Sequence, residues 1–271
     1  MTIRYPCTTL VETAENMNGK HARIWILLSL VVAPLILAGI ELFHPAHFTV
    51  NPGMSNFLSH PQPHDPQFNA VAYFGPHWWF IMHMIQTPLV VVIAFGMLLL
   101  TDTFDAPNPA ARGMPVAWVS RLATVIFAIY FTVLDGIGGI GLGRQLIVLN
   151  ELKDAGKLLP ADVEKVKFFL DRMWVDPWSG GVGSFVSLTG SWAVFVAALS
   201  AAIYLLLNKR VSWPVLLLLV GFGWELQVGH ASFHGPTAFL LLAAAATLIL
   251  VGTKSGRAKS SAPTAFQAGA K

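Results

Sequence analysis

Six long runs of apolar residues, separated by more polar stretches, dominate the pattern along this chain. Each run is long enough, or nearly so, to cross about 30 Å of hydrocarbon as an α-helix. In lipid the backbone must satisfy its own hydrogen bonds, so helices are the structure that runs of this length predict. The predicted membrane segments are Trp25–Phe43, His77–Leu100, Ala117–Ile140, Val182–Leu207, Val211–Gly229 and Pro236–Val251.

The polar stretch between the third and fourth runs has a pattern of its own. Pro160 can begin a helix in its first turn, and Val163, Val166, Leu170 and Met173 then recur at helical spacing. This pattern predicts an amphipathic helix at the outer membrane interface or over the mouth of the bundle. The aromatic belt expected on that side comprises Trp78, Trp79, Trp174 and Trp178.

The predicted fold class is therefore an all-α integral membrane protein. It is a bundle of about six transmembrane helices with an amphipathic helix in the outer loop between helices three and four. We expect residues 1–22 to form a cytoplasmic N-terminal segment, residues 23–252 a single transmembrane domain, and residues 253–271 a disordered cytoplasmic tail.

Composition supports a membrane protein and excludes several other classes. Of the 271 residues, 55% are hydrophobic and only 11% are charged, against about 25% charged residues in soluble domains. The bilayer is thus the expected partner, other membrane subunits are further candidates, and the net charge of +3 does not indicate nucleic-acid binding. The single cysteine, Cys7, excludes a disulfide within the chain and a CxxC redox motif.

The distribution of Lys and Arg predicts the orientation in the membrane. With the N-terminus in the cytoplasm, most basic residues fall on the inner side, and the first outer loop, residues 44–76, has none. The charge-balanced loop at residues 151–176 is long enough to cross regardless of this rule. We therefore expect both termini in the cytoplasm and the protein in a bacterial inner membrane.

Histidines are the most informative candidate functional residues. Seven of the nine fall on the outer side of this topology, and His83 lies about one and a half turns inside the second helix. Imidazole is the commonest metal ligand in proteins and an axial ligand of haem. The candidate ligands of a zinc, iron or copper ion are His44, His47, His77, His83, His230 and His234. For haem b, His83 is the expected axial ligand, with His230 or His234 opposite. The alternative is that outer histidines are ordinary loop residues, as expected for His60 and His64.

Acidic residues at apolar positions are the second set of candidates. They are Glu41, Asp135 and Glu225, which lie within or at the ends of apolar runs. Burying an unpaired carboxylate in hydrocarbon costs on the order of several kcal/mol. Asp135 and Glu225 are the candidate catalytic residues, and the alternative is a salt bridge of either with Arg144. The glycine-rich run at residues 136–141 formally matches GxGxxG, but its place at the end of a membrane helix indicates close helix packing or a hinge instead.

One short motif suggests a resemblance. His230 and His234 have His-x-x-x-His spacing, which resembles the zinc pair of the membrane hydrolase superfamily that includes adiponectin receptors and alkaline ceramidases. That family has a further histidine, an aspartate and a serine on seven helices, whereas six helices are predicted here. The resemblance implies zinc at this pair and carries no activity over.

Three functions are consistent with these patterns. The first is a redox or hydrolytic membrane protein with a histidine-rich metal or haem site near the extracytoplasmic face. The second is a transporter or channel for ions or small solutes that uses Asp135 and Glu225. The third is a non-catalytic subunit of a membrane complex.

Overall fold

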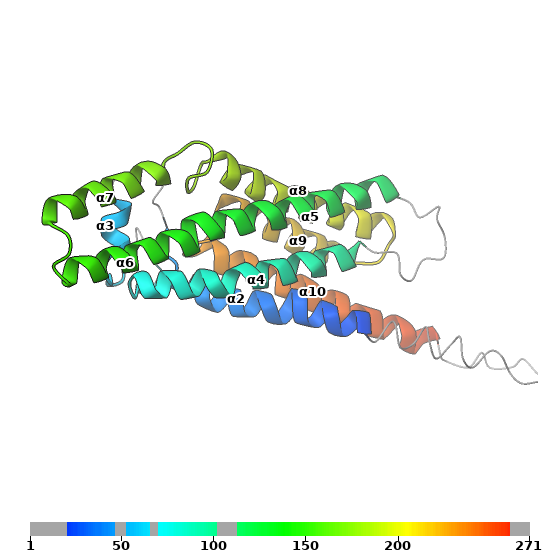
Figure 1. Ribbon diagram of the computed structural model, residues 1–271. Helices are drawn as coiled ribbons and strands as arrows, with labels where there is room; N and C mark the ends of the chain where they lie inside the picture. The colour runs from blue at the N-terminus through cyan, green and yellow to red at the C-terminus, as the bar shows by residue number, and fades with distance from the viewer. Residues whose placement is uncertain (1–20, 47–52, 66–69, 102–112, 261–271) are drawn as a thin grey trace, which may run out of the picture.

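The computed structural model describes residues 21–46, 53–65, 70–101 and 113–260, and of these only the backbone for residues 253–260. The described residues form an elongated bundle of helices (Figure 1). The helical segments, in chain order, are η1 Leu28–Val32, α2 Ala33–Glu41, α3 Met54–Leu58, α4 Pro76–Leu100, α5 Met114–Leu134, η2 Asp135–Gly141, α6 Leu142–Asp154, α7 Pro160–Trp174, α8 Phe185–Leu207, α9 Trp213–Val228 and α10 His234–Ser260.

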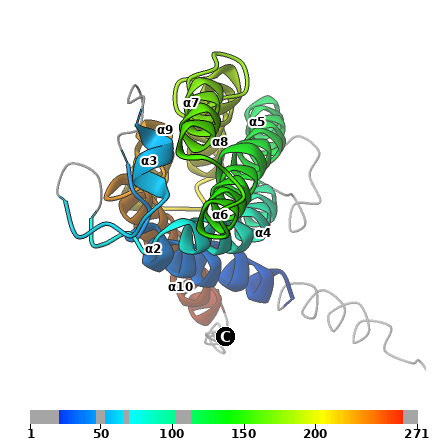
Figure 2. The same ribbon diagram turned by 60° about the vertical axis from the view of Figure 1, so that its left-hand side comes forward.

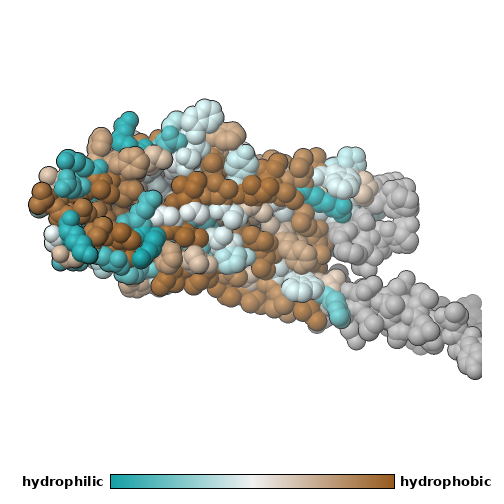
Figure 3. Space-filling model, in the orientation of Figure 1, coloured by the Kyte–Doolittle hydropathy of each residue, from teal (hydrophilic) through white to brown (hydrophobic). Residues whose placement is uncertain are grey.

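Five helices are long and apolar enough to cross a membrane, as expected for an integral membrane protein that contacts the lipid bilayer. They span His21–Glu41, Pro76–Leu100, Met114–Asp154, Phe185–Leu207 and His234–Gly252. The fifth predicted segment corresponds to α9, an apolar helix of 16 residues, which is shorter than the roughly 20 residues that usually span hydrocarbon. Apolar side chains cover the long side of the bundle, and hydrophilic ones gather at the end that contains α6 and α7 (Figure 3).

Small residues bring the helices of the inner core close together. Helix α8 packs between α5 and α9, and Ala197, Ala198 and Ala201 on α8 are fully buried. A β-carbon at Gly223 of α9 would lie 2.8 Å from the β-carbon of Ala198. The close approach of α8 and α9 therefore depends on the absence of a side chain at Gly223.

The third membrane helix is longer than its apolar run predicts. It is continuous from Met114 to Asp154, whereas the sequence placed its end near Ile140. The added part, α6, has low hydropathy because it carries polar residues such as Arg144 and Asn150. The apolar signal ends where the helix leaves the expected hydrocarbon layer, but the residues that follow still favour a helix.

Two π-helical segments interrupt otherwise regular helices. Segment η1 ends just before Pro34, which lacks an N–H and crowds the carbonyl four residues earlier. Segment η2 contains four of the glycines that follow Asp135, and these weaken regular helix formation. Such π-helical turns occur often at functional sites.

Helices α3, α6 and α7 form a cap over one end of the bundle (Figure 2). Ser55 of α3 donates its backbone N–H to the Asp171 carboxylate of α7 at 2.8 Å, and Asn150 of α6 donates to the Ser59 carbonyl at 2.9 Å. Helix α7 spans the stretch in which the sequence predicts a helix, and its place in an outer loop at the membrane interface stays a prediction. The cap closes the end of the bundle where the candidate histidines lie.

Candidate functional site

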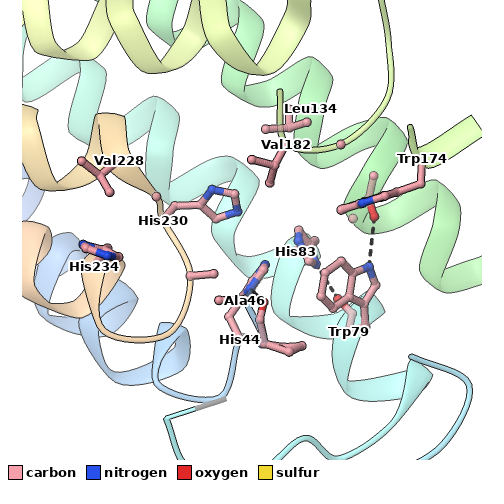
Figure 4. A pocket seen from close by; sticks show the side chains of 16 residues that line it. His44, Ala46, Trp79, His83, Leu134, Trp174, Val182, Val228, His230 and His234 are labelled. Atoms are coloured by element: carbon pink, nitrogen blue, oxygen red, sulfur yellow. Dashed lines mark hydrogen bonds between the residues drawn. The ribbon is translucent and has the colours of Figure 1, made fainter. Parts of the chain in front are cut away.

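A pocket with a volume of about 170 Å³ lies at the capped end of the bundle. The end of α2, the first turns of α4, segment η2 and the connection from α9 to α10 surround it (Figure 4). Its lining residues are His44, Pro45, Ala46, Trp79, His83, Leu134, Gly138, Gly139, Trp174, Gly181, Val182, Val228, Gly229, His230, Ala231 and His234.

Three imidazoles from three distant parts of the chain meet in this pocket. The ring centre of His44 is 5.2 Å from that of His83 and 4.9 Å from that of His230. The three rings face a common space in Figure 4. Two imidazoles that share a tetrahedral metal, with metal–nitrogen distances of about 2.0–2.1 Å, have ring centres roughly 5 Å apart. The separations of His44 from His83 and from His230 are therefore compatible with ligands around a single ion, and they also lie in the range of ordinary packed rings.

Backbone carbonyls hold two of these rings through Nδ1. His44 Nδ1 donates to the Pro45 carbonyl and His83 Nδ1 donates to the Trp79 carbonyl, each at 2.7 Å. Because a carbonyl oxygen can only accept, Nδ1 must carry the proton, and Nε2 of the neutral ring keeps its lone pair. Nε2 of His44 is buried without a partner. Metal-ligating histidines show the same arrangement, with the second ring nitrogen donating to a carbonyl or carboxylate.

Local contacts explain why His44 and His230 meet. The α2 helix ends in a turn in which His44 N–H donates to the Glu41 carbonyl at 3.1 Å. The His44 carbonyl in turn accepts from Ser232 N–H at 3.0 Å, which ties the connection between α9 and α10 to the end of α2. His230, two residues before Ser232, is thereby positioned beside His44.

The ring of His83 can occupy its position because Gly139 has no side chain. A β-carbon at this position of η2 would overlap the imidazole ring of His83. The glycine-rich run thus serves close packing, as the sequence indicates, and the group that it accommodates is a candidate ligand.

Burial keeps the imidazoles of His44 and His230 uncharged at neutral pH. It lowers the pKa of His44 well below its usual value of 6.5, and the neighbouring His230 and His83 lower it further. Burial also lowers the pKa of His230 to about 4. The neutral ring is the form that binds a metal ion.

Aromatic side chains form much of the wall around the imidazoles. The Trp79 ring centre is 4.8 Å from that of His44 and 4.5 Å from that of His83, and Phe131 packs 5.2 Å from His230. Trp79 donates from Nε1 to the Gly138 carbonyl at 3.1 Å. These contacts fix the rings and give the pocket weakly polar walls.

The structure brings together only part of the predicted ligand set. His44, His83 and His230 converge, whereas His77 is exposed on the first turn of α4 and does not line the pocket. His47 lies outside the described residues. His234 lines the pocket, but its Nδ1 is 2.8 Å from the Glu225 carboxylate.

The His-x-x-x-His motif does not lie within one helix. His230 precedes α10 and His234 begins it. The two rings lie apart in Figure 4 and contact different partners. The geometry of a helical zinc pair, which the resemblance implies, is not present between them.

The predicted acidic residues have separate environments. Glu225 bonds His234 at the rim of the pocket, while Asp135 is buried and accepts from the Thr87 hydroxyl at 3.4 Å. Arg144 pairs with Glu151 at 3.8 Å, not with either of the two acids.

Three residues of the site were not predicted from the sequence as site residues. Trp79, expected in the outer aromatic belt, is 1% exposed and packs against two imidazoles. Trp174 and Gly139 also line the pocket. Trp79 lies four residues before His83, so helical periodicity could have placed both on the same face.

Within the described part of the chain, no group of three or more His, Cys, Asp and Glu side chains is already arranged around one point as a bound metal ion requires. The separations of His44 from His83 and His230 therefore do not by themselves make a complete set of ligands. The chain matches no protein-family model, no curated protein and no solved structure.

Proposed function

We propose that the protein is an integral membrane metalloprotein that binds one transition-metal ion through Nε2 of His44, His83 and His230. The observation that carries this proposal is the separation of the ring centres, 5.2 and 4.9 Å from His44, at the value expected for ligands of one metal. To direct Nε2 at the ion, the rings would have to turn about their side-chain bonds, which for His44 and His83 strains the Nδ1 hydrogen bonds to Pro45 and Trp79.

The donor set narrows the choice of ion. Imidazole nitrogens suit zinc, copper and iron, whereas magnesium and calcium prefer oxygen. Three protein ligands leave a fourth coordination position open to the pocket, an arrangement typical of catalytic sites. A haem is a poorer fit, because the ring of His44 contacts both His83 and His230 and so occupies space beside the two rings between which a porphyrin would lie.

The reaction that this site favours is metal-assisted hydrolysis or electron transfer. At its open position a metal ion held by His44, His83 and His230 would act as a Lewis acid or lower the pKa of a bound water, and a redox-active ion would carry an electron. The small pocket and its aromatic walls suit a small, weakly polar substrate.

We further propose that all six apolar segments, including α9, cross a bacterial inner membrane with both termini in the cytoplasm. Arg23 bonds the Leu250 carbonyl at 3.1 Å, so the first and last membrane helices have adjacent ends there. Lys209 and Arg210 follow the end of α8. The capped end then faces outward, with α7 at the interface and its Phe168 and Phe169 side chains exposed.

The remaining two hypotheses have less support from the geometry. Ion transport would require Asp135 and Glu225 to line one path, but they bond Thr87 and His234 respectively. A non-catalytic subunit needs no metal site, so metal content separates that hypothesis from ours.

Elemental analysis of detergent-purified protein, after equilibration with zinc, copper and iron salts and removal of the excess, tests this proposal. We expect about one ion per chain in the wild type and its loss in His44→Ala, His83→Ala and His230→Ala. His77→Ala is the matched control, because His77 lies on the same helix as His83 but is exposed, and it should retain the ion. A wild type without stoichiometric metal, or one whose metal survives all three substitutions, would overturn the proposal.

A further inference from the structure

A second group of polar side chains lies one helical turn below the imidazoles. Glu41 precedes His44 by three residues on α2, Gln86 follows His83 by three on α4, and Asp135 precedes Gly139 by four on η2. All three therefore lie deeper in the bundle than the residues that form the pocket. Their side chains are buried, with exposed fractions of 0% for Glu41, 0% for Gln86 and 1% for Asp135.

These side chains are buried without the partners that such groups need. Both carboxylate oxygens of Glu41, both amide atoms of Gln86 and Oδ1 of Asp135 have no hydrogen-bond partner. Buried polar groups are nearly always bonded, and each exception requires an explanation such as an ion or a water. Gln86, unlike the two acids, carries no charge, and it too lacks hydrogen-bond partners.

The packing of the helices places these groups around a common region. Helix α4, which carries Gln86, contacts both α2 and η2, which carry the two acids. Thr87 of α4 donates to Oδ2 of Asp135 at 3.4 Å, so α4 and η2 are in contact at this level. Gly235 of α10 closes the region from a fourth side, because a β-carbon there would lie 3.3 Å from Cβ of Glu41.

The donor atoms differ in kind from those of the imidazole pocket. Glu41 and Asp135 offer two carboxylate oxygens each, and Gln86 and Thr87 offer one oxygen each. All are hard oxygen donors, which favour calcium or magnesium over copper or zinc. Two carboxylates balance the charge of a divalent ion.

We propose that Glu41, Gln86, Thr87 and Asp135 bind a dehydrated Ca²⁺ ion inside the bundle, one turn below the imidazoles. Calcium takes 6–8 oxygen ligands in flexible geometry, whereas magnesium retains several waters and demands a near-ideal octahedron. Glu41, Gln86 and Asp135 are almost completely buried, which leaves little space for such waters, while Thr87 is partly buried. The ion satisfies the orphaned oxygens and links α2, α4 and η2, the elements that also position His44 and His83.

Calcium titration calorimetry on the calcium-stripped, detergent-purified full-length chain tests this proposal. We expect one Ca²⁺ per chain, no displacement by equal concentrations of Mg²⁺ or Na⁺, and at least tenfold weaker binding in Glu41→Gln and Asp135→Asn. Glu151→Gln, which changes an exposed acid paired with Arg144, should bind like the wild type. Gln86→Leu removes an uncharged donor and should weaken binding even if the charge substitutions impair folding. Absence of stoichiometric calcium from the wild type, or unchanged affinity in all three site variants, would overturn the proposal.

Transition-metal content of the same samples separates this inference from the proposed function. A wild type that binds calcium but no transition metal contradicts only the imidazole site. One that binds a transition metal but no calcium contradicts only the oxygen site. Glu41→Gln protein that loses calcium and retains the transition metal shows that the variant is folded and that the two sites are separate.

Discussion

Gly139 of η2 lies directly against the imidazole of His83, with no room for a side-chain carbon between them. Three positions earlier in the same segment, a β-carbon at Gly136 would meet no atom within 4 Å. The two glycines therefore differ in function although both belong to one glycine-rich run.

This difference predicts the outcome of a pair of alanine substitutions. Gly139→Ala should displace His83, lower the metal content of the protein well below that of the wild type, and lower its melting temperature by several degrees, since overpacking typically costs about 1–3 kcal/mol. Elemental analysis and thermal unfolding in detergent provide the two measurements.

Gly136→Ala is the control for that experiment. It should retain the metal and be neutral or slightly stabilising, because alanine favours a helix by up to about 1 kcal/mol over glycine. Equal metal content in the two variants would show that His83 does not need its present position to bind the ion.

The pKa values of His44 and His230 predict how acid affects the metal-free protein. Both pKa values lie below the ordinary value of 6.5, and that of His230 is about 4. Between pH 6.5 and pH 4 the unfolded chain therefore binds more protons than the folded chain, because these histidines are protonated only when unfolded. Stability is therefore fully present above about pH 6.5 and is lost as the pH falls toward 4. Melting temperatures of metal-stripped protein between pH 7.5 and about 4.5 measure this slope.

Substitution identifies the groups responsible for the slope. His230→Gln removes one titrating group and should make the decrease in melting temperature with acid shallower. His77→Gln, on the exposed first turn of α4, should keep the wild-type slope. A slope that is identical in both variants would assign the acid sensitivity to other residues.

Much of the fold follows from the apolar pattern, but the choice among the histidines does not. His77 and His83 are six residues apart on α4, which places them on different faces of the helix, so only His83 points into the bundle. His230 joins the site because Ser232 bonds the His44 carbonyl across the bundle, a long-range contact that periodicity does not report. The sequence did not predict the extension of the third helix through α6, because hydropathy identifies apolar segments and does not report a helix that continues through polar residues.

Asp171 of α7 is predicted to hold the cap in place over the pocket. Its buried carboxylate accepts the backbone N–H of Ser55 at 2.8 Å, and hydrogen bonds to a charged group contribute about 1.5–3 kcal/mol. Asp171→Ala should loosen α7 from α3 and increase the rate of limited proteolysis within residues 155–184. Protease digestion of detergent-solubilised protein, followed by mass spectrometry of the fragments, measures this rate.

Asp162 provides the comparison on the same helix. It is bonded to Lys165 at the surface, at 3.1 Å, where an ion pair contributes less than about 1 kcal/mol. Asp162→Ala should therefore leave the proteolysis rate close to that of the wild type. Equal sensitivity of both variants would indicate that the bond between Asp171 and Ser55 does not fix the cap.

The number of membrane crossings can be tested with engineered cysteines, because Cys7 is the only native one. In a Cys7→Ser background, a membrane-impermeant thiol reagent applied to intact bacterial cells should label Trp178→Cys, because Trp178 is exposed at the end that we propose faces outward. Arg210→Cys, between α8 and α9, should react only after the membrane is permeabilised. The opposite result for these two positions would reverse the proposed orientation.

Phe233→Cys decides whether α9 crosses the membrane. Phe233 is 58% exposed between α9 and α10, and α9, at about 24 Å for 16 residues, is shorter than the hydrocarbon layer. A helix of this length can cross if the bilayer thins locally, at a modest cost per ångström of mismatch. We expect Phe233→Cys to react in intact cells like Trp178→Cys, because His230, which precedes it by three residues, lies in the pocket at the capped end. If it reacts only after permeabilisation, α9 does not cross, and the outward position of the imidazole pocket would be wrong as well.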